Sequence, residues 1–255
     1  MKIVCVVPTY NCATEISSTL NSALEISSLI DEIWVIDNGS KDNTLNEVIR
    51  FRKINSKQNV RIFQNLSNIN LGGTHKVAFR MAISGAFTHL IILHGDNQAS
   101  PLDLLPVLKT IENQDFEISY FGSRFSRQSR TIGYSIARKA GNMVLNTIFS
   151  VFTHKLLTDL GSGLNLYNLE QIKKLDVDIL TDEMSFNYEL LLKFVGHDLT
   201  FKYFPISWSE HSQVSNARNS RVFIEGLMAL VRWRLRLCRQ SQVIVRHKLP
   251  SELLP

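Results

Sequence analysis

The chain has 255 residues, 44% of them hydrophobic and 20% charged, which is ordinary for a folded globular protein and argues against disorder. It has no window of roughly 18 consecutive apolar residues and no charged-then-apolar leader, so neither a transmembrane helix nor a secretory signal is expected. Its three cysteines have no metal-ligand spacing and favour a reduced, cytosolic compartment.

Strand and helix patterns alternate in the first part of the chain. Apolar runs predict strands over residues 3–7, 32–36, 60–63 and 88–93. Helical patterns separate them over residues 14–30, 41–53 and 74–84. This alternation predicts βαβ units with right-handed crossovers, and therefore an α/β fold with a mostly parallel, Rossmann-like sheet flanked by helices.

The pattern changes after residue 98. Helices are expected over residues 101–111, 133–157 and 182–195, and strands over residues 116–121, 162–167 and 199–206. No internal repeat or Gly/Ser-rich linker interrupts this part. We therefore expect one continuous domain over residues 1–215, followed by a basic helical segment over residues 216–255.

The positive charge of the chain is concentrated in that last segment. Residues 218–248 hold eight Arg or Lys and one acid, so the net charge of +5 does not describe the body of the chain. One face of the predicted helix carries Arg232, Arg236 and Arg239, and the opposite face is apolar with Phe223, Leu227, Leu230 and Leu237. Such a basic amphipathic helix suits an anionic membrane surface; the alternative is a helix packed on the domain with solvated arginines. Order is least expected over the tail, 248–255.

Polar residues follow the first two predicted strands. Ligands of α/β sheets bind outside the carboxyl ends of parallel strands. Tyr10, in Pro8-Thr9-Tyr10-Asn11, suits contact with a nucleobase, and Asp37, before Asn38-Gly39-Ser40, suits hydrogen bonds from a base or ribose. The alternatives are an ordinary strand-to-helix turn for the first and a helix-capping turn for the second.

The strongest single motif is His94-Gly95-Asp96-Asn97-Gln98, directly after a buried strand. Mg²⁺ and Mn²⁺ take oxygen ligands and share them with diphosphates, so the Asp96 carboxylate with Gln98 predicts a metal site. His94 is a further candidate ligand that suits Mn²⁺ better than Mg²⁺. The alternative for His94 is a packing histidine with a fixed tautomer.

Other candidate residues lie further along the chain. The glycines of Asn70-x-Gly72-Gly73 open a helix and allow backbone N–H groups to approach phosphate, or simply form a turn. Arg124 and Arg138 belong to a basic group suited to phosphate, although solvated surface is the usual explanation of such charges. Asp182 and Glu183 begin a helix, where they serve either as a general base or as helix-capping charges.

The order of these motifs resembles that of the family 2 glycosyltransferases. The likeness rests on Val7-Pro8-Thr9-Tyr10-Asn11, Ile36-Asp37-Asn38-Gly39-Ser40, Asn70-x-Gly72 and Gly95-Asp96-x-Gln98. Later motifs look like the dolichol-phosphate mannosyltransferase branch, namely Gly122-Ser123-Arg124-Phe125, Arg138-Lys139, Ser162-Gly163-Leu164-x-x-Tyr167 and Tyr188-Glu189-Leu190. The resemblance implies a GT-A fold and an enzyme that uses nucleotide-diphosphate sugars with inversion.

The resemblance also implies roles for individual residues. It places the nucleotide sugar on Pro8, Tyr10, Asn11, Asp37 and Gly72. It assigns the metal–diphosphate site to Asp96 and Gln98, the acceptor phosphate to Arg124 and Arg138, and a position near the acceptor to Glu189. This chain departs from the branch at three positions. The branch usually has aspartate where this chain has His94 and Asn38, and lysine where this chain has Asn216.

The predicted function is therefore metal-dependent transfer of a sugar to a polyprenyl phosphate, at the cytoplasmic face of a membrane. An anionic phosphate acceptor needs no general base, whereas a sugar-hydroxyl acceptor in cell-surface polysaccharide synthesis needs one, with Asp182 or Glu183 as candidates. A non-catalytic nucleotide-sugar binder is a third possibility, because His94 replaces an acid. Nucleotidyl transfer and nucleic-acid binding are disfavoured, since the loop after the first strand lacks a basic residue and the arginines lack interleaved aromatics.

Overall fold

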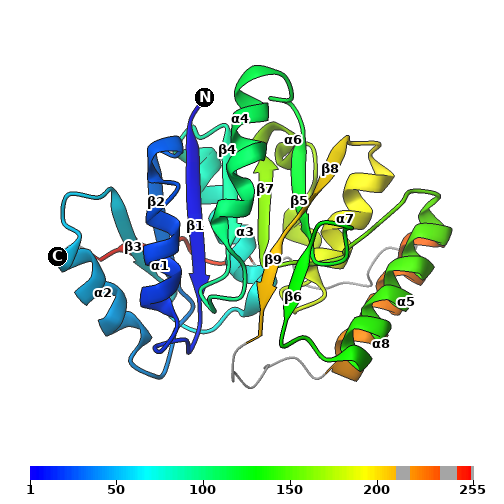
Figure 1. Ribbon diagram of the computed structural model, residues 1–255, viewed down its shortest axis with the longest axis horizontal. Coiled ribbons are helices and arrows are strands. Elements are labelled where there is room, and N and C mark those ends of the chain that lie inside the picture. The colour runs from blue at the N-terminus through cyan, green and yellow to red at the C-terminus, as the bar shows by residue number, and fades with distance from the viewer. Residues whose placement is uncertain (211–218, 236–245, 254–255) are drawn as a thin grey trace.

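The computed structural model describes residues 1–210, 219–235 and 246–253 (Figure 1). Within these residues one sheet has the strand order β10-β3-β2-β1-β4-β7-β5-β8, and a small parallel pair joins β6 to β9. The strands of the large sheet are β1 (Ile3–Thr9), β2 (Glu32–Asp37), β3 (Val60–Gln64), β4 (His89–Leu93), β5 (Ser119–Ser123), β7 (Leu164–Asn168), β8 (Phe201–Pro205) and β10 (Ser251–Glu252). The pair consists of β6 (Arg130–Ile132) and β9 (Ser207–Ser209).

Helices cover both faces of the large sheet (Figure 1). Those on the face of α1 are α1 (Ile16–Leu24), α2 (Thr44–Ile54) and α4 (Leu105–Asn113). Those on the other face are α3 (Asn70–Ser84), α5 (Ile136–Thr153), α6 (Leu169–Lys173), α7 (Phe186–Gly196) and α8 (Asn219–Arg234). Short 3₁₀ turns lie at Ser27–Leu29, Pro101–Leu104 and Val177–Ile179.

The apolar runs of the first strands are explained by burial on both faces. In β1, Val4 and Val6 belong to one hydrophobic core, and Ile3, Cys5 and Val7 belong to the other. A strand covered by helices on both sides reads as a continuous hydrophobic run rather than an alternating one. The predicted mostly parallel sheet is confirmed for β3, β2, β1 and β4, which are parallel to one another.

The later strands are not all parallel. Strand β7 lies between β4 and β5 and is antiparallel to both, while β8 is again parallel to β5. The chain passes from β1 to β2 on one side and returns through β4 on the other side of β1. This reversal of strand order opens a crevice beyond the carboxyl ends of β1 and β4, the usual ligand position of such sheets.

The C-terminal segment is only partly helical. Helix α8 ends at Arg234, and its Ala229 and Leu230 are buried against the domain. The residues from 246 onward run back to the sheet, where β10 pairs antiparallel with the edge strand β3 and Glu252 binds Arg61 at 2.7 Å. The expectation of a disordered tail is therefore wrong through residue 253, because a free sheet edge and an ion pair hold it. Arg236, Leu237 and Arg239 lie outside the described residues.

Helix α8 packs closely against the rest of the domain. A Cβ added at Gly226 would lie 2.9 Å from the Tyr188 ring and 3.5 Å from Leu145, so the helix approaches α7 and α5 closely there. Phe223 and Leu227 also pack against the core. The face opposite the predicted arginine face thus packs on the domain. No helix within residues 1–210 and 219–235 is long and apolar enough to cross a lipid bilayer.

Candidate active site

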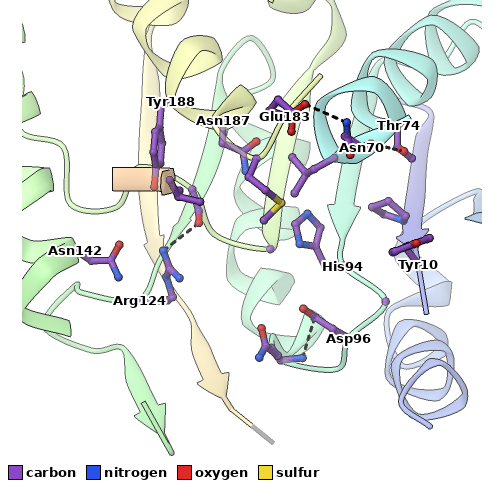
Figure 2. Close-up of a pocket in the computed structure, with 18 of the residues that line it drawn as sticks. Tyr10, Asn70, Thr74, His94, Asp96, Arg124, Asn142, Glu183, Asn187 and Tyr188 are labelled. Carbon is purple, nitrogen blue, oxygen red and sulfur yellow. Dashed lines mark hydrogen bonds between the residues drawn. The ribbon is translucent and has the colours of Figure 1, made fainter. Parts of the chain in front are cut away.

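A cavity of about 1070 Å³ lies beyond the carboxyl ends of β1 and β4 (Figure 2). One end is formed by the loops after these two strands and by the start of α3. The other end is formed by the residue after β5 and by α5, α7 and α8. Among the lining residues used below are Pro8, Tyr10, Asn11, His94, Asp96, Gln98, Arg124, Tyr134, Arg138, Gly163 and Glu183.

The loop after β1 presents Tyr10 to the cavity and is braced by its neighbour Asn11. Asn11 adopts a left-handed φ of 50°, which asparagine tolerates better than most residues. Its side-chain oxygen accepts a hydrogen bond from Lys41 N at 2.8 Å, and its own N–H donates to Ser40 Oγ at 3.0 Å. The loops after β1 and β2 are therefore joined, and the Tyr10 ring lies on the cavity wall with Pro8 beside it.

Two residues predicted to bind the nucleotide do not line the cavity. Asp37 is fully buried, and its carboxylate accepts hydrogen bonds from Ser40 N and Gln64 Nε2, both at 3.2 Å. Gly72 lies within α3, where an added Cβ would stand 2.7 Å from Phe186 Cβ. In the structure, Asp37 closes its own turn and Gly72 permits close packing of α3 against the start of α7.

The loop after β4 brings Asp96 and Gln98 to the cavity as predicted. The Asp96 carboxylate accepts a long hydrogen bond of 3.4 Å from Gln98 N, and burial raises its pKa. The carboxylate and the Gln98 amide oxygen are hard donors that fit Mg²⁺ or Mn²⁺. The described residues contain no cluster of three or more His, Cys, Asp or Glu suited to a metal. A cation here would therefore complete its shell with water and ligand phosphate.

His94 also lines the cavity, but its ring faces a second histidine. His94 Nε2 lies 3.3 Å from Nε2 of His75, a fully buried residue of α3 that sequence reasoning missed. Burial lowers the pKa of both rings, that of His75 well below its ordinary value. The two positions are 19 residues apart on a strand end and a helix, so no local spacing indicates the pair.

The opposite end of the cavity holds two arginines whose partners are acids. Arg124 Nε and Nη2 each donate to Asp159 at 2.8 Å, and Nη2 also donates to the Gly161 carbonyl at 3.0 Å. Burial lowers the pKa of Arg124 and Asp159 raises it, with an upward net shift. Arg138 Nη1 binds Glu210 at 2.6 Å. The sequence placed both arginines in this region but did not indicate their acidic partners.

The Tyr134 ring is close to both arginines. Its ring centroid is 5.8 Å from the Arg124 guanidinium carbon and 5.1 Å from that of Arg138. Asn142 Nδ2 donates to the Tyr134 hydroxyl at 2.6 Å, and burial raises the pKa of that hydroxyl. A flat aromatic surface and an amide thus lie beside two oriented cations, an arrangement suited to an anionic group with further polar substituents.

Only one of the three carboxylates at the start of α7 faces the cavity. Asp182 binds Lys76 Nζ and His247 Nε2, both at 2.9 Å, outside the cavity wall. Glu189 accepts from Thr181 N at 2.9 Å and binds Arg232 at 3.3 Å. Their contacts are those of packing residues; the helix-capping alternative given for Asp182 is not what the structure shows, because α7 has no side-chain cap and Asp182 binds Lys76 and His247.

Glu183 is the carboxylate of this group that lines the cavity. It accepts a hydrogen bond of 3.3 Å from Asn70 Nδ2, the side chain of a residue with a left-handed φ of 60° at the start of α3 (Figure 2). Of the two general-base candidates, Glu183 is therefore the one with access to a ligand. Asn216 lies outside the described residues.

The sequence model described as "Glycosyl transferase family 2" matches residues 4–175. The chain belongs to this family. It is a glycosyltransferase. Family membership therefore argues against the alternative of a non-catalytic nucleotide-sugar binder. The resemblance inferred from the strand-end motifs is confirmed.

Curated relatives cover most of the chain. An uncharacterized protein of Methanocaldococcus jannaschii, MJ1222, is 26% identical over 87% of this chain and 86% of its own length. A UDP-N-acetylglucosamine–dolichyl-phosphate N-acetylglucosaminyltransferase of Methanococcus voltae is 24% identical over 86% of this chain and 90% of its own. A dolichyl-phosphate beta-glucosyltransferase of Saccharomyces cerevisiae is 26% identical over 80% of this chain and 66% of its own.

Solved structures confirm the fold. Mannosyl-3-phosphoglycerate synthase from Rubrobacter xylanophilus has a TM-score of 0.65 at 14% identity, over 95% of this chain and 78% of its own. Glucosyl-3-phosphoglycerate synthase from Mycobacterium tuberculosis, solved with Mn²⁺, UDP and glucosyl-3-phosphoglycerate, has a TM-score of 0.64 at 12% identity, over 95% of this chain and 81% of its own. The predicted α/β fold of GT-A type is therefore correct.

Proposed function

We propose that this family 2 glycosyltransferase moves a sugar from a nucleoside diphosphate sugar to a polyprenyl phosphate, with inversion and with a divalent cation. One observation carries the proposal: a single cavity has a nearly unpartnered carboxylate, Asp96, at one end and the cations Arg124 and Arg138 at the other. The names of the two dolichyl-phosphate transferases among its relatives support the same donor and acceptor classes.

The donor end has the groups that a nucleotide sugar requires. The Tyr10 ring offers an apolar surface with a polar tip for the base. Asp96 and Gln98 would hold Mg²⁺ or Mn²⁺, which, when bound, neutralises the charge that grows on the leaving diphosphate. Asp37 has no place on the cavity wall, so we propose that it supports the binding loop from behind rather than contacting the nucleotide.

The acceptor end orients a phosphate, and a phosphate nucleophile needs no general base. Asp159 fixes the plane of the Arg124 guanidinium through two hydrogen bonds of 2.8 Å. Arg138 belongs to α5, and its guanidinium carbon lies 5.1 Å from the centroid of the Tyr134 ring. Because a phosphate oxygen is already anionic, it attacks the anomeric carbon once it is positioned, and no residue has to remove a proton.

A sugar-hydroxyl acceptor is the second candidate, and the position of Glu183 on the cavity wall favours it. A hydroxyl nucleophile needs a base within hydrogen-bond reach, and Glu183 is a carboxylate at the junction of the donor and acceptor ends. Glu183→Gln separates the two candidates, because it removes the base but keeps the size and the hydrogen-bonding capacity of the side chain.

We also propose that the enzyme works at the cytoplasmic face of a membrane, to which its outward helix faces bind. On α5, Ile136, Met143, Val144 and Val151 are 51–87% exposed. At helical spacing along α8 and the residue after it, Ile224, Met228, Val231 and Leu235 are 52–62% exposed. Single exposed apolar residues are common, but two stripes on adjacent helices are not.

The position of these stripes fits a lipid acceptor. Helices α5 and α8 contact each other at one end of the molecule (Figure 1), and both also line the cavity. Lys139 and Arg234 are exposed beside the stripes, as an anionic bilayer surface would require. Arg138 lies on α5, one of the helices that contact the bilayer in this proposal. A polyprenyl phosphate entering from that surface would therefore meet Arg138 close to the membrane.

Transfer assays test the acceptor class. UDP, GDP and dTDP sugars are supplied with Mn²⁺ and with either polyprenyl phosphate or free oligosaccharides. We expect transfer to polyprenyl phosphate by the wild type and by Glu183→Gln at similar rates. Transfer only to hydroxyl acceptors, lost in Glu183→Gln, would establish the second candidate instead. Donor binding without transfer to either acceptor class would contradict both.

Vesicle flotation tests the membrane surface. Met143→Glu combined with Val231→Glu should abolish salt-sensitive binding to vesicles that contain anionic lipid, because two charges enter the apolar stripes. The matched control is Ile54→Glu combined with Leu66→Glu, at exposed apolar positions in other parts of the chain that flank β3. Equal flotation of the two double variants would refute the proposed surface.

A further inference from the structure

The histidine pair at the donor end, His75 and His94, restricts which ring nitrogen of His94 carries the proton. His94 Nε2 is 3.3 Å from Nε2 of His75, a distance at which one ring donates and the other accepts. His75 is fully buried in α3, with Phe186 edge-on at 5.5 Å and Phe79 at 6.5 Å. Its other nitrogen, Nδ1, is buried and has no hydrogen-bond partner among the described residues.

Two neutral tautomer arrangements satisfy this contact. In the first, His75 carries its proton on Nε2 and donates to His94 Nε2, so His94 carries its proton on Nδ1. In the second, His94 donates from Nε2, and His75 must carry its proton on the buried Nδ1. Orphaned buried N–H groups are rare in folded proteins, and the second arrangement creates one beside the phenylalanines. The first arrangement is therefore favoured.

Gly163 lies against the Nδ1 side of His94 and has no side chain to cover that nitrogen. A Cβ added at Gly163 would lie 3.1 Å from His94 Nδ1, and both residues line the cavity. The backbone fixes the two residues together, because His94 N donates to the Gly163 carbonyl at 2.9 Å. The uncovered nitrogen is thus held at the cavity wall, two residues from the Asp96 carboxylate.

We propose that His75 is a positioning residue that fixes the Nδ1–H tautomer of His94, so that His94 donates a hydrogen bond to an anionic or hydroxyl oxygen of the donor and does not bind the metal. The ligand part of this inference rests on the proposed function, but the tautomer does not. The Nε2 lone pair of His94 is occupied by His75, and Nδ1 carries a proton. The metal site is then built from oxygen donors alone.

This assignment changes what the donor end requires. Where the related branch usually has an aspartate, a neutral N–H donor removes one negative charge from the neighbourhood of the diphosphate. Repulsion between the site and the nucleotide is lower, so nucleotide binding should depend less on the cation than in a site with two acids. The histidine pair thus lowers the dependence of nucleotide binding on a bound cation.

NMR of the whole chain tests the tautomer directly. Imidazole nitrogens with and without a proton have well-separated ¹⁵N shifts, and His94→Asn and His75→Gln variants assign the signals. We expect His94 to be protonated on Nδ1 and His75 on Nε2, both without ligand and with Mg²⁺ and UDP or GDP. A His94 protonated on Nε2, or loss of the Nδ1 proton when Mg²⁺ binds, would overturn the proposal whether or not the chain binds a nucleotide.

Metal and nucleotide binding test the consequence. With UDP or GDP present, His94→Ala should leave Mn²⁺ affinity within about threefold, and the Mn²⁺ electron spin echo should show no modulation from a bound imidazole nitrogen. Without metal, His94→Ala should weaken nucleotide binding about tenfold, the loss of one hydrogen bond to a charged group. A selective loss of Mn²⁺ affinity in His94→Ala would make His94 a ligand and refute the assignment.

Variants at His75 separate positioning from packing. His75→Gln keeps an N–H donor toward His94 and should bind metal-free nucleotide within about threefold of the wild type. His75→Leu fills similar space without a donor and should weaken that binding about tenfold. His89→Gln removes another fully buried histidine, outside the cavity wall, and is the matched control with unchanged nucleotide affinity. Equal loss in His75→Gln and His75→Leu would reduce His75 to a packing residue.

Discussion

The two ends of the cavity differ in how their charges are balanced. At the donor end, Asp96 receives a single long hydrogen bond from Gln98 N, and no described cation pairs with it. At the acceptor end, Arg124 and Arg138 each bind an acid at 2.8 Å or less. The donor end therefore carries an unpaired negative charge that a cation could balance, whereas the acceptor end is neutralised and oriented in advance. A site with an unpaired charge attracts a group of opposite charge, whereas a site with paired charges holds its side chains in a fixed orientation.

Removal of the donor-end charge should have the largest effect. Asp96→Asn keeps the shape of the side chain but removes the anionic ligand for the cation. We expect sugar transfer to fall about a thousandfold, equivalent to roughly 4 kcal/mol of transition-state stabilisation. The rate is measured at saturating donor together with Mn²⁺ affinity, and Glu25→Gln, an exposed acid of the donor half, is the control. Unchanged metal-dependent transfer in Asp96→Asn would move the metal site elsewhere.

Removal of an acceptor-end acid should mainly lower stability. Asp159→Ala leaves the buried guanidinium of Arg124 without its partner, and breaking a buried ion pair costs about 3–5 kcal/mol. Urea denaturation should show this loss in the free energy of unfolding. The control is Asp198→Asn, which removes the charge of an exposed pair with Lys155, keeps a residue type that tolerates the left-handed φ of 54° there, and should leave the unfolding midpoint unchanged. Equal midpoints for both variants would mean that the acceptor end is not pre-organised by its acids.

The donor end was largely predictable from sequence because its parts are contiguous. Tyr10, Asp96 and Gln98 each follow a buried strand, and parallel strand ends meet at one edge of a sheet. Two predicted residues, Asp37 and Gly72, lie off the cavity wall for local reasons. Asp37 is turned inward by Ser40 and Gln64, and Gly72 serves helix packing. A strand-end aspartate or a helix glycine looks the same in sequence whether it faces a ligand or a neighbour.

The acceptor end was less predictable because its pairs are remote in sequence. Arg124 and Asp159 are separated by 35 residues, and Arg138 and Glu210 by 72. Strand β7 also enters the sheet antiparallel between β4 and β5, an order that repeated βαβ units do not imply. The sequence therefore indicated basic residues near the cleft but not the acids that bind them.

A buried histidine at the amino end of β4, away from the cavity, predicts a pH dependence of stability. His89 in β4 donates from Nε2 to the Phe116 carbonyl at 2.9 Å, and burial lowers its pKa to about 4. The unfolded chain binds a proton near the ordinary histidine pKa of about 6.5, so the folded state loses stability as pH falls from 6.5 toward 4. Complete titration of this one group would cost about 3 kcal/mol.

The substitution His89→Gln isolates this contribution. It should lower stability at pH 7 and flatten the dependence between pH 6.5 and 4, whereas His197→Gln, at an exposed position, should keep the wild-type slope. Denaturation midpoints measured at several pH values give both slopes. A steep slope that survives in His89→Gln would assign the acid sensitivity to another group.

Two glycines offer the smallest and most direct comparison of the two ends. An added Cβ at Gly72 of α3 would clash with Phe186 and the Thr181 carbonyl, so Gly72→Ala should destabilise the fold by about 1–3 kcal/mol. At Gly141 of α5 an added Cβ meets nothing within 4 Å, so Gly141→Ala should stabilise the helix by about 1 kcal/mol. Thermal unfolding gives the signs. If Gly72→Ala instead kept its stability and lost only nucleotide affinity, Gly72 would be a binding glycine after all, and the donor end would be built from backbone contacts rather than from side chains.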